Sequence, residues 1–468
     1  MSPPRAVVVV GAVIAILLAA SPGAVTAGEP TVTSPATSVL SLRRVPGLVA
    51  DQIAANRLVS GLDSALAAAP ADACLVVTDA KGVLFARNAD LPLVPASTLK
   101  LVTAAVALDL WGPDHQFVTS TVAAGSTTEG RLDGDLYLVG GGDPVLGTAG
   151  FAASLPGAGS RSRTSLESLA DAVVDAGVRQ VAGSVIGDGS RHDSARFVPG
   201  WDPVDLTGDT VGALGALRVN AGLNGWNTEP GRPGRRGQPG DPALEAAAIF
   251  TTLLTDRGVA VGGPPRQGSA PAGSSVVARQ LSAPLGAILG EVLTWSDNGA
   301  AEQLLREIGL ATGGSGSTNA GTAAVVAALQ RWGLPTAGFV MLDGSGLHTG
   351  NRVTCALLSS LMTRVSGQAA LIENLPLAGA SGTLTNRLTE DGTAGLVRAK
   401  TGTLDTVRAL AGAAFAGDGR LAHFAWVANG ARNDPALSTE WPDAAVRVIR
   451  RFPERPDLAA LGPQHRKG

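Results

Sequence analysis

Lysine is scarce in this sequence. Only four of its 36 basic residues are lysines, at positions 81, 100, 400 and 467. Arginine serves a surface ion pair equally well, whereas a base that must lose its proton cannot be arginine. The stretch "PASTLK", residues 95 to 100, places Ser97 and Lys100 three positions apart. Lys100 is therefore a candidate base for Ser97.

Features that mark other classes of protein are also missing. The two cysteines, Cys74 and Cys355, lack the pair spacing of a metal or redox motif. We expect both to be buried as small hydrophobic side chains, although an oxidising compartment would permit a single bridge. A net charge of -3 and a pI near 6.0 give no electrostatic footprint for nucleic acid. The chain has no G-x-S-x-G, H-E-x-x-H or phosphate-loop motif.

The N-terminus has the layout of a secretory signal. Arg5 precedes an apolar run over 6–20, and small residues follow at Val25 and Ala27. The run is about 15 residues, short of the roughly 20 that span a bilayer. We therefore expect an exported, extracytoplasmic protein, and membrane association through an uncleaved N-terminal segment stays open.

Helix and strand patterns follow a Ser/Thr/Pro-rich linker. Residues 73–90 hold two β-rich runs around Lys81-Gly82, which predicts a hairpin. The segment 97–112 is apolar nearly all round, which predicts a helix buried in the core.

From about residue 120 a separate α/β module is expected. Ser165 and Gly177 bound an amphipathic helix, Asp241 and Gly258 bound another, and 181–188 reads as a strand. We predict a signal peptide (1–27), a linker (28–44), a discontinuous first domain (45–122 and 279–455), an inserted domain (123–278) and a C-terminal tail (456–468).

Two further short motifs carry candidate chemistry. "SDN" places Ser296 and Asn298 two apart, and in an extended loop both would project to the same side. A helix N-cap is the alternative role for either residue. "KTG" places Lys400, Thr401 and Gly402 in a β-like run, where Gly402 would let a ligand approach the strand. An edge lysine beside a turn is the plainer interpretation.

The order S-x-x-K, S-D-N, K-T-G is far more specific than any one motif. The chain resembles the D-alanyl-D-alanine carboxypeptidases/endopeptidases of the PBP4 type, peptidase family S13. The resemblance extends to "GDLYLVGGGDPVL" (134–146), "SDNGAAEQL" (296–304), "DGSGL" (343–347) and "LPLAGASGTL" (375–384). It implies an α/β (α+β) penicillin-binding, β-lactamase-like fold, in which helices flank a five-stranded antiparallel sheet and a smaller α/β domain is inserted.

A further small domain that many members carry is expected to be absent, because only the loop 221–241 stands at its place. Trp295 replaces the usual lysine before S-D-N.

The resemblance also implies a mechanism without metal or cofactor. Lys100 takes the proton of Ser97 as Ser97 attacks the penultimate D-alanine of a peptidoglycan stem peptide, and Ser296 passes the proton on. β-Lactam antibiotics would acylate the same serine. The substrate-binding positions it implies are Asn298, Lys400, Thr401, Gly402, Thr403 and Asp188. A nearby Lys400 charge would help to keep Lys100 neutral.

Asp188 and the overall function each have an alternative. In family members an aspartate near this position meets the free amine of the diaminopimelate side chain, whereas an aspartate in a Gly-Asp-Gly turn is most often a solvated turn former. The function is expected to be that of a serine-type D-Ala-D-Ala carboxypeptidase, with possible endopeptidase activity. The alternatives are a β-lactamase and a non-catalytic cell-wall-binding scaffold.

Overall fold

The computed structural model describes residues 41–207, 210–223, 240–432, 434 and 437–463. The signal peptide, most of the linker and most of the loop 221–241 lie outside these residues, so the expectations placed on them stay predictions. The described chain divides into two units, which are taken separately. The smaller unit, 1–49 and 457–468, contains η1 (Leu42–Arg44), the first residues of α1 (Pro46–Ala65) and α13 (Leu458–Leu461).

The larger unit, 50–456, contains a five-stranded antiparallel sheet in the order β14-β15-β16-β1-β2. The predicted hairpin is confirmed as β1 and β2, paired across the turn at Lys81-Gly82. The other three strands come from the C-terminal part of the chain, so the sheet joins segments more than 300 residues apart. The strands are β1 (Ala73–Asp79), β2 (Gly82–Arg87), β14 (Val397–Leu404), β15 (Val407–Phe415) and β16 (Leu421–Asn429).

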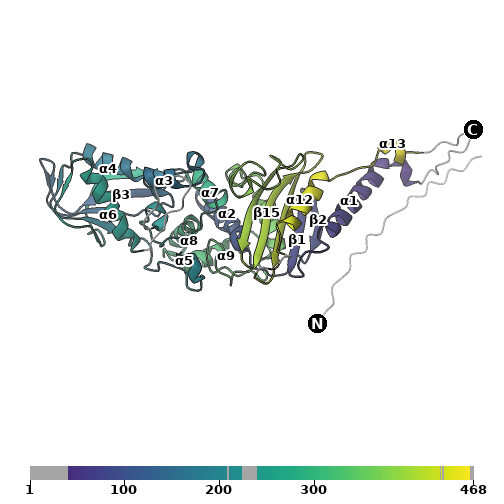
Figure 1. The fold of residues 1–468 in the computed structure, drawn as a ribbon, viewed down its shortest axis with the longest axis horizontal. Helices are drawn as coiled ribbons and strands as arrows, with labels where there is room; N and C mark the ends of the chain where they lie inside the picture. The colour runs from purple at the N-terminus through teal and green to yellow at the C-terminus, as the bar shows by residue number, and fades with distance from the viewer. Residues whose placement is uncertain (1–40, 208–209, 224–239, 433, 435–436, 464–468) are drawn as a thin grey trace, which may run out of the picture. The chain divides into compact units, whose positions relative to one another are not determined.

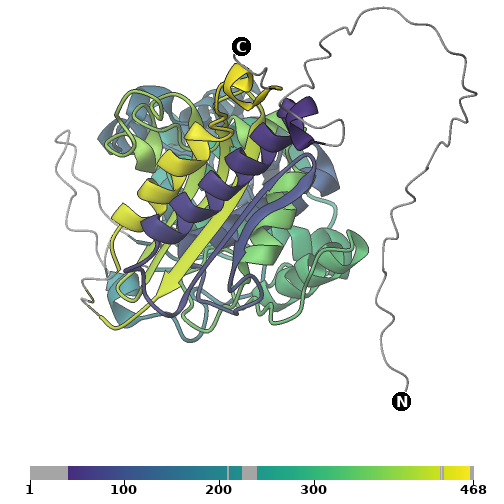
Figure 2. The same ribbon diagram turned by 90° about the vertical axis from the view of Figure 1, so that its right-hand side faces the viewer.

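The three central strands β15, β16 and β1 are apolar at nearly every position, and both of their faces are buried. In β1, Cys74 and Val76 point into one hydrophobic cluster, whereas Leu75 and Val77 point into another. The second cluster is covered by α1, from Ala50 onward, and by α12 (Glu440–Arg451), which lie side by side over the sheet in Figure 2.

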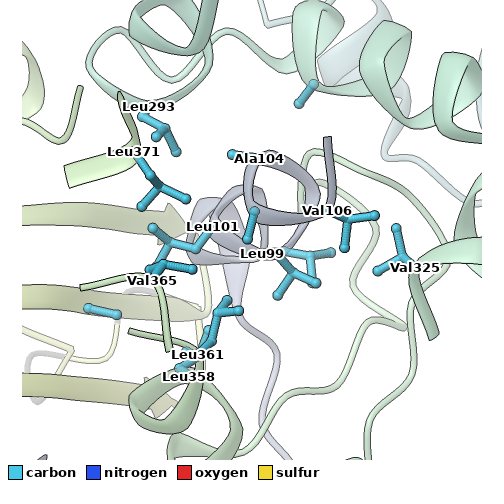
Figure 3. Close-up of a cluster of buried hydrophobic side chains, with 14 of the residues drawn as sticks. Leu99, Leu101, Ala104, Val106, Leu293, Val325, Leu358, Leu361, Val365 and Leu371 are labelled. Atoms are coloured by element: carbon cyan, nitrogen blue, oxygen red, sulfur yellow. The ribbon is translucent and has the colours of Figure 1, made fainter. Parts of the chain in front are cut away.

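The other face is covered by helices packed around α2 (Lys100–Trp111), which is the predicted buried helix. Figure 3 shows its side chains Leu101, Ala104 and Val106 surrounded by residues of neighbouring segments. These neighbours are α7 (Leu285–Leu293), α8 (Asn298–Gly313), α9 (Thr318–Arg331), α10 (Cys355–Arg364) and α11 (Ala369–Ile372). The short η2 (Ala96–Leu99) precedes α2, and η5 (Gly382–Leu384) lies beside β14.

A disulfide crosses this core. Cys74 at the start of β1 and Cys355 at the start of α10 are bonded, with a Cα–Cα distance of 6.0 Å. The expectation of two free, buried cysteines is therefore wrong, although both are buried. They come together because α10 packs against β1.

The middle of the chain forms separate sheets. A five-stranded mixed sheet has the order β12-β10-β6-β3-β13, and a four-stranded sheet has the order β11-β9-β5-β4. α4 and α6 pack against them in one hydrophobic cluster (Figure 1). The strands are β3 (Val118–Ala123), β4 (Thr127–Thr128), β5 (Arg131–Leu132), β6 (Leu136–Val139), β9 (Gln180–Val181), β10 (Val185–Asp188), β11 (Ala260–Val261), β12 (Arg266–Gln267) and β13 (Ser275–Leu281). The predicted domain boundaries stay predictions.

The two helices expected in this region are confirmed. α4 (Leu166–Asp175) begins after Ser165, whose side chain accepts from the Ser168 N–H, and α6 (Pro242–Thr255) is capped by Asp241. The strand expected over 181–188 is instead split between β9 and β10, which belong to different sheets. The remaining elements are β7 (Leu146–Gly147), α3 (Ala149–Ser154), η3 (Ala158–Ser160), β8 (Thr164–Ser165), α5 (Pro203–Thr207) and η4 (Asn220–Gly222).

Among the described residues, no helix is long and apolar enough to cross a membrane.

Candidate active site

Ser97 and Lys100 lie at the junction of η2 and α2, on the same side of the helical turn. The Lys100 Nζ donates to the Ser97 Oγ at 2.8 Å, to the Asn298 Oδ1 at 2.6 Å and to the Ser345 carbonyl at 2.7 Å. The lysine is completely buried. The amine is thus held directly against the hydroxyl that it would deprotonate, as the sequence predicts.

Burial is the main cause of a shift in the pKa of Lys100. Desolvation lowers this pKa to about 8, while the nearby carboxylates of Asp343, Glu302 and Asp297 act in the opposite direction. The Lys400 charge, which the sequence argument invoked, is not among the causes for Lys100. A lysine with a pKa near 8 is neutral in about one molecule in ten at pH 7, far more than an ordinary lysine, so it can accept a proton.

The S-D-N segment is not the extended loop that we expected. Ser296 has a left-handed φ of 61°, Asp297 is the N-cap of α8 and Asn298 is the first residue of that helix. The cap is therefore Asp297, whose side chain accepts from the Ala300 N–H, rather than either neighbour. The sharp turn directs Ser296 to Lys400 and Asn298 to Lys100.

The K-T-G segment lies in β14, at the edge of the first sheet next to η2. The Lys400 Nζ donates to the Ser296 Oγ at 2.9 Å, and the Thr401 Oγ1 donates to the Thr383 Oγ1 at 2.8 Å. A Cβ on Gly402 would lie 2.7 Å from the Pro95 carbonyl, so glycine is needed for β14 to pass close to the Ser97 turn.

The open edge of β14 presents backbone donors toward the site. The Ala399 N–H donates to the Pro376 carbonyl, outside the pairing of β14 with β15. Because alternate residues of a strand direct their N–H groups to the same edge, Thr401 and Thr403 share this direction. The Thr403 N–H is thus available to a ligand on the Ser97 side.

Burial also lowers the pKa of Lys400 well below its usual value, and the charge of Lys100 adds to this effect. The charge of Lys100 thus acts on the pKa of Lys400, whereas no effect of Lys400 is found on the pKa of Lys100. A carboxylate bound beside Lys400 would favour its charged form again.

Sequence reasoning missed the loop that completes the lysine site. The sequence indicates "DGSGL" as a family-like block in which Asp343 fixes the loop, but it does not predict a contact with Lys100. Its Ser345 carbonyl accepts from Lys100, and Asp343 accepts from the N–H groups of Gly346 and His348. Gly346 has φ 87°, and a Cβ there would lie 1.9 Å from the Ala96 carbonyl. The loop is thus packed directly against the Ser97 turn.

A hollow of about 240 Å³ opens beside the S-D-N segment. Ser296 and Asn298 contribute to its lining, together with Trp295 and Arg161. The Arg161 guanidinium lies over the Trp295 ring, 5.2 Å from its centroid, and pairs with the Glu291 carboxylate at 2.6 Å. Trp295 is therefore a wall of the hollow and a platform for Arg161.

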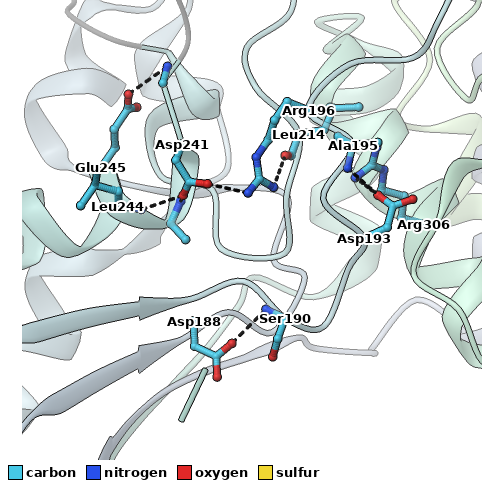
Figure 4. A network of polar contacts seen from close by, with 12 residues as sticks. Asp188, Ser190, Asp193, Ala195, Arg196, Leu214, Asp241, Leu244, Glu245 and Arg306 are labelled. Atoms are coloured by element: carbon cyan, nitrogen blue, oxygen red, sulfur yellow. Dashed lines mark hydrogen bonds and ion pairs between the residues drawn. The ribbon is translucent and has the colours of Figure 1, made fainter. Parts of the chain in front are cut away.

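Asp188 is not brought together with the other predicted residues. It lies at the end of β10 and is 5% exposed. One carboxylate oxygen accepts from the Ser190 N–H at 2.9 Å (Figure 4). The other accepts from the Ala270 N–H at 2.8 Å. This geometry favours a carboxylate that fixes its own loop, so the substrate-reading role stays a prediction.

Comparisons with known proteins agree with this geometry. The model of the D-Ala-D-Ala carboxypeptidase 3 (S13) family matches residues 58–240 and 238–451. The chain is a member of the S13 family. It is 32% identical to a D-alanyl-D-alanine carboxypeptidase of Actinomadura sp., over 82% of each protein. It is 34% identical to a carboxypeptidase of Mycobacterium tuberculosis, over 80% of this chain and 81% of that protein.

The fold of this S13 member is that of a penicillin-binding protein. The crystal structure of penicillin binding protein 4 from Haemophilus influenzae matches with a TM-score of 0.69 and 23% identity, over 83% of this chain and 97% of that one. The expected S13 family and fold class are thus confirmed, and the protein is a carboxypeptidase.

Proposed function

We propose that this protein is a serine-type D-Ala-D-Ala carboxypeptidase that trims peptidoglycan stem peptides through an acyl-serine intermediate. One observation carries the proposal: the Lys100 amine, whose pKa is lowered by burial, contacts the Ser97 hydroxyl at 2.8 Å. A serine hydroxyl is a weak nucleophile until an adjacent base takes its proton.

In the acylation step, the Ser97 Oγ attacks the carbonyl carbon of the penultimate D-alanine, and its proton passes to the Lys100 Nζ. The oxyanion that forms lies between the N–H groups of Ser97 and Thr403. Each such donor is typically worth about 3 kcal/mol of transition-state stabilisation.

The leaving nitrogen must then gain a proton as the peptide bond breaks. Lys100 gives up the Ser97 proton through Ser296, whose Oγ accepts from the Lys400 Nζ and whose own O–H can donate to the leaving nitrogen, so Lys100 becomes neutral again. Terminal D-alanine departs, and its carboxylate is held by Lys400 and Thr401 on the open edge of β14. Lys100 then takes a proton from the water that attacks the acyl-serine and returns it to the Ser97 Oγ as the shortened peptide leaves.

Asn298 makes two hydrogen bonds that matter in this mechanism. Its Oδ1 holds the Lys100 Nζ, and its amide nitrogen donates to the Thr210 carbonyl at 2.8 Å. The residue thus links the base to the segment that lines the hollow, where it can orient the substrate amide.

Penicillin would acylate Ser97 in the same way, because its strained amide replaces the D-Ala-D-Ala bond. Penicillin binding protein 4 from Haemophilus influenzae has been solved in complex with a β-lactam. Action outside the cytoplasm is consistent with the family and with the Cys74–Cys355 disulfide, which would not persist in a reducing cytosol. Membrane anchoring stays a prediction.

The β-lactamase alternative is not favoured, since the family match covers most of the chain and is to carboxypeptidases. A non-catalytic scaffold would have no need for two buried lysines, each hydrogen-bonded to a serine.

Release of D-alanine from a peptide ending in D-Ala-D-Ala tests the proposal. Wild type should release it stoichiometrically with the shortened peptide, and Ser97→Ala should release none. Ser60→Ala, at an exposed serine of α1, serves as the matched control and should behave as wild type. Release by Ser97→Ala at the wild-type rate would disprove the assignment.

A further inference from the structure

Glu302 is a buried carboxylate next to the site that the mechanism above does not use. It lies on α8, one helical turn after Asn298, and is completely buried. Its Oε1 accepts from the N–H groups of Gly344 and Ser345, at 2.9 and 2.8 Å. No partner is present for its Oε2 in the described part of the chain. A buried carboxylate oxygen without a hydrogen-bond partner lowers stability unless a nearby charged group compensates.

Lys100 is the charged group on which Glu302 acts. The Ser345 residue that donates its N–H to Glu302 accepts from the Lys100 Nζ through its carbonyl. The Gly344 carbonyl is held in turn by the Thr103 hydroxyl at 2.8 Å. The peptide between Gly344 and Ser345 is thus clamped between α8 and α2, and the next peptide presents the Ser345 carbonyl to the Lys100 amine.

The charges that face Glu302 come from three elements. Lys100 lies on α2 and Asp343 precedes the clamped peptide, while Arg306 lies one turn further along α8. From a fourth segment, the buried Arg218 also interacts with the Glu302 charge, which opposes the lowering of the Arg218 pKa by burial. Burial, followed by the Asp343 charge, raises the pKa of Glu302 to about 7. Glu302 and Lys100 therefore titrate as a coupled pair over neighbouring pH ranges.

We propose that Glu302 is a positioning residue that fixes the Ser345 carbonyl against Lys100 and supplies the negative charge behind it. Its ionisation thereby sets the pH range in which Lys100 accepts the Ser97 proton. The inference rests on the proposed roles of Ser97 and Lys100.

The two contributions, charge and clamp, are separable by substitution. Glu302→Gln removes the charge but keeps an oxygen that can accept both N–H groups. Glu302→Asp keeps the charge but shortens the side chain by one methylene, which loosens the clamp. Glu307→Gln is the matched control, because Glu307 is equally buried on the same helix and bonds Arg191 and His192 instead.

The measurement is the second-order rate of acylation by a fluorescent penicillin, followed from about pH 6 to about pH 10, with the melting temperature of each variant. The wild-type rate should rise with a midpoint near pH 8. Without the Glu302 charge, protonated Lys100 is less stable, so the midpoint of Glu302→Gln should fall by about one pH unit with a similar plateau. Glu302→Asp should keep the midpoint and lose about tenfold in plateau rate. Glu307→Gln should follow the wild-type profile.

A Glu302→Gln profile that coincides with wild type overturns the inference while leaving the proposed function intact. If Glu302→Gln does not fold, Glu302→Asp decides: an unshifted midpoint with a lower plateau supports the inference, and any other profile overturns it. A wild type that is not labelled at any pH overturns the proposed function and this inference together.

Discussion

Removal of the Cys74–Cys355 disulfide should destabilise the fold without disabling the site. The two residues are separated by 281 positions, and closing a loop of that length in the unfolded chain corresponds to about 5.6 kcal/mol at 25 °C. Measured contributions usually fall below this entropic value. We therefore expect the double variant Cys74→Ala, Cys355→Ala to lose about 4 kcal/mol in the free energy of unfolding.

The site should survive because neither cysteine touches it. Cys74 and Cys355 belong to the hydrophobic cluster between the first sheet and the helices around α2. Alanine leaves no buried hydroxyl there, so labelling by penicillin under native conditions should remain within about twofold of wild type.

Urea unfolding followed by tryptophan fluorescence measures the loss, since Trp426 is buried in the same sheet. Alkylation of the denatured wild type, with and without reductant, checks that the bond is present. A loss smaller than about 1 kcal/mol, or two free thiols in unreduced wild type, would refute the reasoning.

Four further results are expected. Acylation by penicillin should rise with pH around a midpoint near 8, because Lys100 must be neutral, so the rate at pH 7 should be about one tenth of the plateau; a flat profile contradicts this. Lys100→Arg should lower the rate by about a thousandfold, since guanidinium cannot accept the proton, and near-wild-type acylation by this variant would exclude Lys100 as the base. Gly346→Ala should cost more in melting temperature and acylation rate than Gly333→Ala, because both have positive φ but only the former would bring a Cβ against the Ala96 carbonyl; equal losses would remove the steric argument. Because both Asp188 oxygens bind its own loop, Asp188→Asn should weaken cleavage equally for peptides with a free or an acetylated side-chain amine, and a loss confined to the free amine would support the predicted substrate-reading role instead.

The sequence predicted the elements that carry the chemistry because local patterns encode them. The Lys81-Gly82 hairpin and the apolar helix after Ser97 follow from hydrophobic periodicity and turn residues. The order of the three motifs indicated which distant segments meet. The contacts of Lys100 with Ser97 and of Lys400 with Ser296 agree with that expectation.

The missed features depend on tertiary packing that no local pattern records. The disulfide joins residues from two elements that meet only when α10 packs on β1. The left-handed φ of Ser296 and the cap at Asp297 were missed because S-D-N alone does not distinguish a loop from a helix start. The Ser345 contribution comes from a backbone carbonyl, which has no signature in side-chain identity.

Locating the covalent penicillin adduct tests the central claim most directly. The protein is incubated with a fluorescent penicillin, digested, and the labelled peptide is sequenced by mass spectrometry. We predict a single adduct on the Ser97 hydroxyl, and none on Ser97→Ala, whose fold should be intact because only one oxygen is lost. An adduct on Ser296 or on any residue other than Ser97, or stoichiometric labelling of Ser97→Ala, would contradict the assignment of Ser97 as the nucleophile.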